Sequence, residues 1–210
     1  MSEQDHESPK SDRLKPIVVL AAGHYPYSPG CKYHGLVEHD LNIMTTALVA
    51  VRLEDKYKVH IVTGNLKEKT DAAKRIFRQM PLKEAVKAPN LCAVEMHFNG
   101  FEDPSVGGTE VLYGLDSHDQ ILAQYIQAEL VRRLGLKDRG VKFADYSGTP
   151  KLDECAFTRL IKQPAVIVEP LFISNPEEAE LIKNPLTQEI IADGIAAGIE
   201  KFTEAINALV

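Results

Sequence analysis

The feature that most constrains the fold is the regular alternation of short apolar runs with longer segments of helical periodicity. Each run has the length of a buried strand, and the intervening segments space their apolar residues as amphipathic helices do. This alternation predicts an α/β fold: a single three-layer domain with a mixed, mostly parallel sheet of about six strands and helices on both faces. The predicted strands are Ile17–Ala22, Val59–Thr63, Leu91–Phe98, Thr109–Tyr113, Val141–Phe143 and Ala165–Leu171.

Three segments carry the clearest helical pattern. One covers residues 117–135 and is expected to end at Gly135, because glycine favours a helix C-terminus. Another is the final helix, which is predicted over residues 186–209. A third covers residues 38–57, and its apolar stripe is predicted to consist of Leu41, Met44, Leu48 and Val51.

Charge and composition exclude several classes of protein. Residues 1–15 are polar and are predicted to be a disordered leader without the apolar core of a signal peptide, and residues 16–210 are predicted to form one domain. The net charge of −6 argues against a broad nucleic-acid-binding face. No stretch approaches the roughly 18 consecutive apolar residues of a membrane span. We therefore expect synthesis in the cytoplasm, no membrane insertion and no nucleic-acid partner.

The cysteines do not suggest a disulfide framework. The three residues, Cys31, Cys92 and Cys155, are odd in number and contain no C-x-x-C pair. They are expected to be reduced thiols.

Polar side chains gather at the ends of the predicted strands, where open α/β sheets collect ligands. His24 follows the first run, His97 follows the third, and Glu169 lies near the end of the last, in the apolar context VIVEPLF. Glu38 lies at the start of the helix over 38–57, where the helix dipole favours an anion. Two imidazoles and a carboxylate are a common ligand set for catalytic Zn²⁺, and a second carboxylate can take the proton of the activated water.

The order of the motifs is more specific than their composition. The chain reads VVLAAGH, EHDLN, AVEMHFNG, GGTEVLYG, DRGVK and PAVIVEPLFISNPEEAELI. From Ile17 to the last helix this order resembles the zinc-dependent N-acetylmuramoyl-L-alanine amidases, the family often called amidase type 3. The resemblance implies that His24, Glu38 and His97 bind zinc and that Glu169 is the catalytic carboxylate, in a zinc amidase catalytic domain.

The chain departs from the family pattern at a few positions. Ala21 stands where the family usually has an acidic residue, and Tyr25 stands where glycine usually follows the first ligand. Glu95 replaces a small residue, and Pro170-Leu171 replaces a common Thr-Gly. None of these changes removes a proposed ligand, but they bear on pocket shape and substrate preference.

The resemblance also implies a function and a setting. The substrate would be peptidoglycan or a muropeptide, cut between N-acetylmuramic acid and L-alanine by a phage endolysin or a bacterial autolysin that acts on the cell wall after release. Cell-division members carry a helical insertion that blocks the zinc site, whereas Gly114 here leads almost directly into the next helix. No obligatory protein activator is therefore expected. The alternatives are a non-catalytic wall-binding relative and a zinc amidohydrolase or carboxypeptidase acting on small soluble substrates.

Other polar residues have weaker claims. Cys31, His34, Glu38 and His39 are close in sequence, yet a metal site built from them alone would lack support from the sheet. His34 is a candidate for lining the cleft, whereas His39 is expected on the solvated face. For Glu110 and Asn99 a site role and a plain strand or turn role stay equally open. The chain lacks the G-x-S-x-G, H-E-x-x-H and nucleotide-binding glycine motifs.

Overall fold

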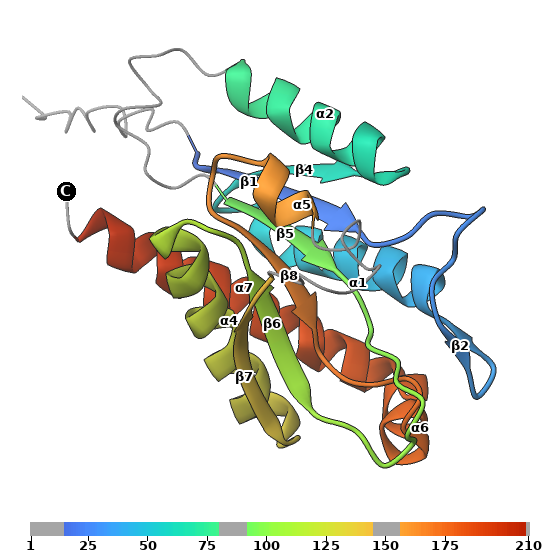
Figure 1. Ribbon diagram of the computed structural model, residues 1–210. Helices are drawn as coiled ribbons and strands as arrows, with labels where there is room; N and C mark the ends of the chain where they lie inside the picture. The colour runs from blue at the N-terminus through green and yellow to red at the C-terminus, as the bar shows by residue number, and fades with distance from the viewer. Residues whose placement is uncertain (1–14, 80–91, 145–155, 209–210) are drawn as a thin grey trace, which may run out of the picture.

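The computed structural model describes residues 15–79, 92–144 and 156–208. At its centre a six-stranded sheet has the order β4-β1-β5-β8-β6-β7 (Figure 1). Every neighbouring pair is parallel except β6 with β8, which is antiparallel. The strands are β1 Ile17–Ala22, β4 Lys58–Val62, β5 Cys92–Met96, β6 Thr109–Tyr113, β7 Asp138–Phe143 and β8 Ala165–Glu169.

Helices cover both faces of this sheet. One face packs against α1 (Glu38–Leu53), α4 (Ser117–Leu134) and α7 (Pro185–Asn207), and the other packs against α2 (Leu66–Arg78) and α5 (Ala156–Leu160) (Figure 1). A further helix, α6 (Pro176–Lys183), precedes α7. The observed architecture confirms the predicted three layers and the mixed, mostly parallel sheet.

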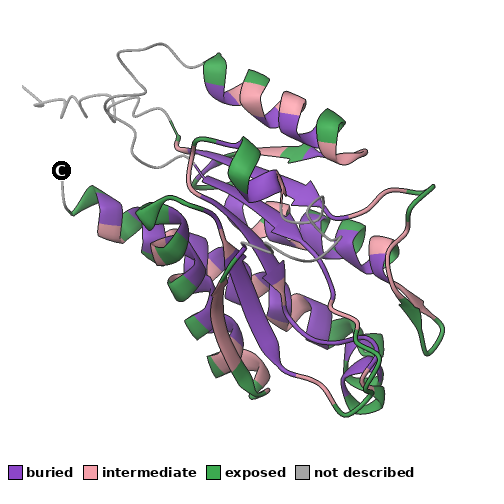
Figure 2. Cartoon of the chain, in the orientation of Figure 1, coloured by how far each residue is buried: buried purple, intermediate pink, exposed green. Residues whose placement is uncertain are grey.

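The central strands are buried on both faces because their side chains alternate between two apolar clusters. In β1, Val18 and Leu20 join the cluster beneath α1, α4 and α7, whereas Val19 and Ala21 join the cluster beneath α2 and α5. All residues of β1 and β5 are buried, as Figure 2 shows for the middle of the sheet. A strand that is apolar on both sides is fixed in position, so the residues that follow it are also held in place.

One prediction about local structure is wrong. The predicted stripe on α1 includes Met44 and Val51, which are 51% and 61% exposed. The buried face of α1 contains Asn42, Thr45 and Val49 instead, and Nδ2 of Asn42 donates a hydrogen bond to the carbonyl oxygen of Gly23 at 3.1 Å. The hairpin of β2 (Lys32–Tyr33) and β3 (Leu36–Val37) was not predicted.

Some predictions fall outside the described residues: the leader up to residue 14, Leu91 at the start of the third run, Cys155 and the last residue of the final helix. Within the described parts, no helix has both the length and the apolar character that a membrane span requires.

Candidate active site

Four chain segments deliver the predicted site residues to one edge of the sheet. His24 follows β1 after Gly23, and His97 directly follows the last residue of β5. Glu38 is the first residue of α1, and Glu169 is the last residue of β8. Because β1, β5 and β8 are parallel neighbours, their carboxyl ends share this edge.

Three of these side chains converge. Nε2 of His24 lies 3.1 Å and Nδ1 of His97 lies 3.0 Å from Oε1 of Glu38. Their potential ligand atoms all lie within 4.8 Å of one another, and in the described residues no other group of three or more His, Cys, Asp or Glu does so. The Glu38 and His97 side chains are buried, whereas that of His24 is partly exposed. The cluster therefore has one open side.

The donor set fits a divalent metal ion. Two imidazole nitrogens and one carboxylate oxygen leave a fourth tetrahedral position for water or substrate. Zinc–donor bonds of about 2.0–2.1 Å would separate tetrahedral donors by roughly 3.3 Å. The separations of 3.0 and 3.1 Å between the Glu38 oxygen and the two histidine nitrogens are close to that value. The three residues thus form a candidate metal centre.

The backbone around the cluster is shaped by close contacts. His24 has a φ of 61°, a left-handed conformation that L-residues seldom adopt. A Cβ at Gly30 would lie 2.3 Å from Oε2 of Glu38 and 2.6 Å from Nε2 of His24, and a Cβ at Gly23 would lie 2.4 Å from Nε2 of His97. Glycine is therefore required at both places. Strained conformations of this kind are concentrated at functional sites.

Hydrogen bonds keep Glu38 ionised. Burial by itself raises the pKa of Glu38, but the side chains of His24 and His97 outweigh burial and lower that pKa well below its usual range. The backbone N–H of Cys31 also donates to Oε2 of Glu38, at 2.9 Å. For His97, burial lowers the pKa, and the carboxylates of Glu38 and Glu95 reverse this and raise it well above its usual value. In the metal-free state the cluster is thus a buried ion pair.

Glu169 borders the cluster from β8. The backbone N–H of His97 donates to the carbonyl oxygen of Val168, the residue before Glu169, at 3.0 Å. The Glu169 carboxylate is also among the charges that raise the pKa of His97. Glu169 is not part of the close group of three ligand-type side chains. This is the placement expected of a carboxylate that acts beside a metal, and its catalytic role stays a prediction.

A charged group flanks Glu169 on the neighbouring strand. Glu110 of β6 is the register partner of Glu169. Its carboxylate accepts hydrogen bonds from Nδ2 of Asn99 at 2.8 Å and from the side chains of Arg139 and Lys142. Burial raises the pKa of Glu110, but the two cations outweigh it and lower the pKa. Asn99 and Glu110, whose roles the sequence left open, thus form one network beside Glu169.

The alternative metal site near the hairpin is not assembled. Within the described residues the close ligand group excludes Cys31, His34 and His39. His34 is exposed, and its Nε2 lies 3.3 Å from the carbonyl oxygen of Ser174. The prediction that His39 lies on the solvated face is wrong: His39 is half-buried, and its Nδ1 lies 3.4 Å from the carbonyl oxygen of Gly23, because α1 begins beside the end of β1.

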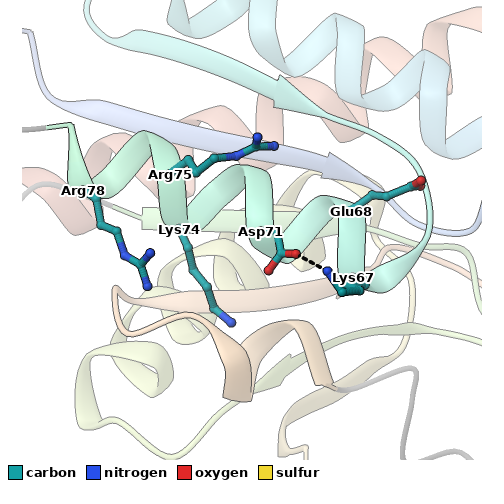
Figure 3. A pocket seen from close by; sticks show the side chains of 6 residues that line it. All are labelled: Lys67, Glu68, Asp71, Lys74, Arg75 and Arg78. Atoms are coloured by element: carbon teal, nitrogen blue, oxygen red, sulfur yellow. Dashed lines mark hydrogen bonds and ion pairs between the residues drawn. The ribbon is translucent and has the colours of Figure 1, made fainter.

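A separate hollow of about 480 Å³ lies along α2 and includes none of the predicted site residues. The exposed ion pair of Lys67 and Asp71 is part of its wall. Figure 3 shows the lining, which is Lys67, Glu68, Asp71, Lys74, Arg75 and Arg78. All six residues come from one helix and are charged, so this hollow is a solvated helix face.

Sequence reasoning missed one feature close to the cluster. Lys69 of α2 forms a buried ion pair with Glu95 of β5, two residues before His97. The sequence contained part of the signal for this ion pair, because Glu95 is a charged residue within the apolar strand AVEMH. Its cationic partner lies 26 residues away on a helix that the sequence did not reveal.

Comparison with known proteins places this chain among the N-acetylmuramoyl-L-alanine amidases. Residues 18–201 match the N-acetylmuramoyl-L-alanine amidase family, and the chain belongs to that family. It is similar to the endolysin of Bacillus phage SPP1, with 27% identity over 190 residues that cover 89% of this chain and 65% of the endolysin. It is also similar to the germination-specific N-acetylmuramoyl-L-alanine amidase of Bacillus subtilis strain 168, with 28% identity over 90% of this chain and 80% of that protein.

The fold also matches solved structures. The crystal structure of N-acetylmuramoyl-L-alanine amidase from Clostridium difficile 630 aligns with a TM-score of 0.74 and 21% identity, covering 91% of this chain and 98% of that one. The match supports the fold. The chain spans 65% of the length of the phage endolysin, so the relatives include a longer protein.

Proposed function

We propose that this chain is a zinc-dependent peptidoglycan hydrolase that cleaves the amide bond between N-acetylmuramic acid and L-alanine of the stem peptide. His24, Glu38 and His97 hold the zinc ion, and Glu169 is the catalytic carboxylate. The observation that carries this proposal is the convergence of three ligand-type side chains within 4.8 Å, in a chain of the amidase family.

The chemistry divides between the ion and the protein. When bound, zinc supplies a Lewis acid that makes a water molecule nucleophilic near neutral pH and polarises the scissile carbonyl group. Glu169 accepts the proton of the attacking water on a carboxylate oxygen and passes it to the nitrogen of the leaving amine. Glu38 remains an anion at neutral pH, since its pKa lies well below the usual range. His24 and His97 each present one neutral ring nitrogen.

Digestion of purified sacculi tests the reaction. Mass spectrometry of the solubilised material should find intact stem peptides with free L-alanine amines. His24→Ala and His97→Ala should each lose both metal and activity, because two ligands do not complete the site. Glu169→Gln should keep about one zinc per chain and lose turnover. If the newly formed end group is not the amine of L-alanine, the enzyme cleaves a different bond and the proposal is wrong.

The same experiment separates the alternatives. A wall-binding relative would release nothing, and its Glu169→Gln variant would bind sacculi as the parent does. An amidohydrolase or carboxypeptidase of small substrates would leave sacculi intact and cleave soluble amides or peptides.

We further propose that the protein is made in the cytoplasm and acts on the wall after release, as an endolysin or autolysin without an obligatory activator. The expectation that no activator is required is supported by the start of α4 at Ser117, three residues after Gly114, which leaves no room there for an inserted blocking helix. Lysis of sacculi by the purified protein alone is the expected result. A requirement for a second protein would contradict it.

A further inference from the structure

An ion pair is buried between α2 and the sheet, next to the candidate metal centre. Nζ of Lys69 contacts Oε1 of Glu95, and the two side chains are only 4% and 2% exposed. The surroundings are apolar, because Ala21 and Ala93 on the same sheet face and Ala73 of α2 belong to the cluster packed there.

Stability alone does not account for this pair. Removing two charges from water is costly, and replacing a buried pair by apolar side chains often leaves stability unchanged or raises it. The rest of the buried face of α2, with Thr70, Ala73 and Phe77, needs no cation to pack against the sheet. A role at the neighbouring site would account for the two buried charges.

The pair touches both segments that carry the candidate histidine ligands. Nζ of Lys69 also donates to the carbonyl oxygen of Ala22 at 3.0 Å, two residues before His24. Oε2 of Glu95 lies 3.7 Å from Nε2 of His97, the ring nitrogen opposite the one that faces Glu38. Since 3.7 Å exceeds a hydrogen bond, this contact is electrostatic in the metal-free structure.

The register of the strands explains how a carboxylate fits there. Glu95 is the register partner of Ala21 on β1, whose small side chain leaves space beside it. Glu95 and His97 are two residues apart in extended chain, so they lie on the same face of the sheet. Lys69 reaches that face from α2 and holds the other carboxylate oxygen.

We propose that Lys69 and Glu95 form a positioning pair for the metal centre. Glu95 favours the imidazole tautomer of His97 that carries its proton on Nε2, which leaves the Nδ1 lone pair directed at the metal beside Glu38. Lys69 fixes the Glu95 carboxylate and ties it to the β1 end that leads into His24. This inference rests on the proposed zinc site, and outer partners of ligating histidines typically change metal affinity by about 10–100-fold.

The test compares zinc affinity, measured by chelator competition, among the parent and three variants. Lys69→Met/Glu95→Leu removes the pair without leaving a buried charge, and Glu95→Gln removes only the carboxylate charge. Lys67→Met is the matched control, because it breaks an exposed ion pair on the same helix (Figure 3). We expect zinc affinity to fall about 10–100-fold in the double variant and in Glu95→Gln, and to stay within about twofold in the control.

A second readout separates positioning from folding. The visible spectrum of the cobalt-substituted protein reports ligand geometry, and it should change in both Glu95 variants. Thermal unfolding of the metal-free double variant should stay close to that of the parent, because this variant leaves no unpaired buried charge. Parental zinc affinity and an unchanged cobalt spectrum in Glu95→Gln would overturn the inference, even where the double variant does not fold. A parent that binds no zinc would instead overturn the proposed function.

Discussion

The carboxyl edge of the sheet and the layer formed by α4 and α7 are both well packed, but different kinds of side chain are buried in them. At the edge, four ionisable side chains are buried close together, namely Glu38, Lys69, Glu95 and His97. Between α4 and α7 the contacts are made by apolar residues such as Ile126, Ile199 and Phe202, all fully buried. Glu129 of α4 is also buried, but its carboxylate pairs with Arg132, Arg133 and Lys201, whose side chains are 61%, 29% and 54% exposed.

This difference distinguishes contacts that stabilise the fold from side chains that we propose to act in the reaction. Apolar burial between helices is favourable by itself and needs no function to explain it. Buried charges are expensive unless they are paired, and even then they seldom raise stability above that of an apolar core. Under the proposed function, the buried charges of the carboxyl edge lower stability and serve catalysis, and the variants below should respond accordingly.

The largest effect is expected from Glu169→Gln. Loss of the group that moves the proton should reduce the turnover of sacculi by about 10²–10⁴-fold. Zinc content and the free energy of unfolding should stay near those of the parent, since the amide has nearly the same shape. Inductively coupled plasma mass spectrometry and thermal melts check these two quantities. Retained turnover would show that the proton is moved by another group.

Phe202→Ala should lower stability and leave zinc binding unchanged. Its ring is fully buried in the main apolar cluster, so truncation should lower the free energy of unfolding by about 3–5 kcal/mol. Once folded, the variant should bind zinc with parental affinity. Denaturant unfolding with and without the metal measures both effects. A loss of zinc affinity in the folded variant would show that the α4–α7 layer also contributes to zinc binding, which contradicts this account.

Zinc should stabilise the protein more strongly as the pH rises. Zinc at about 100 times its dissociation constant contributes about 2.7 kcal/mol. The pKa of metal-free His97 is raised, so its ion pair stabilises the fold fully below the unfolded pKa and is lost as the pH rises through the folded pKa. Zinc needs the neutral imidazole, so protons compete with it below that folded pKa. Melting curves with and without zinc from about pH 6 to about pH 9 should diverge; a constant difference would argue against His97 as a ligand.

The smallest effect is expected from Glu129→Gln at the helix rim. The hydrogen bond from Arg132, followed by the charge of Lys201, lowers the pKa of Glu129 to about 2 although burial opposes this. A lowered pKa means that the stabilisation is present above about pH 4.5 and is lost as the pH falls through about 2. At pH 7 the variant should lose no more than about 1 kcal/mol, because Arg132 and Lys201 are 61% and 54% exposed and the amide still accepts hydrogen bonds. Zinc affinity should not change.

The sequence predicted the sheet well because its strands are apolar on both faces. Ile17–Ala22 and Thr109–Tyr113 have the predicted bounds, and the other runs overlap their strands. β7 begins earlier than predicted, at Asp138, because its first residues are polar and pair at the edge of the sheet. The helix α2 was not predicted, since its buried face is narrow and includes Lys69.

For the site, motif order was sufficient to select three residues that the structure brings together. His24, Glu38 and His97 each occupy an element boundary, and such boundaries can be read from a strand end or a helix start. The pairing of Lys69 with Glu95 could not be read in this way, because it depends on how α2 packs on the sheet. The half-buried position of His39 depends likewise on the packing of α1 against β1.

Anomalous diffraction at the zinc edge from crystals of the zinc-loaded protein tests the central claim most directly. A single strong peak should lie within bonding distance of Nε2 of His24, the Glu38 carboxylate and Nδ1 of His97, with the Glu169 carboxylate beside it and not bonded to it. A peak beside the thiol of Cys31, or no peak at this edge of the sheet, would contradict the account.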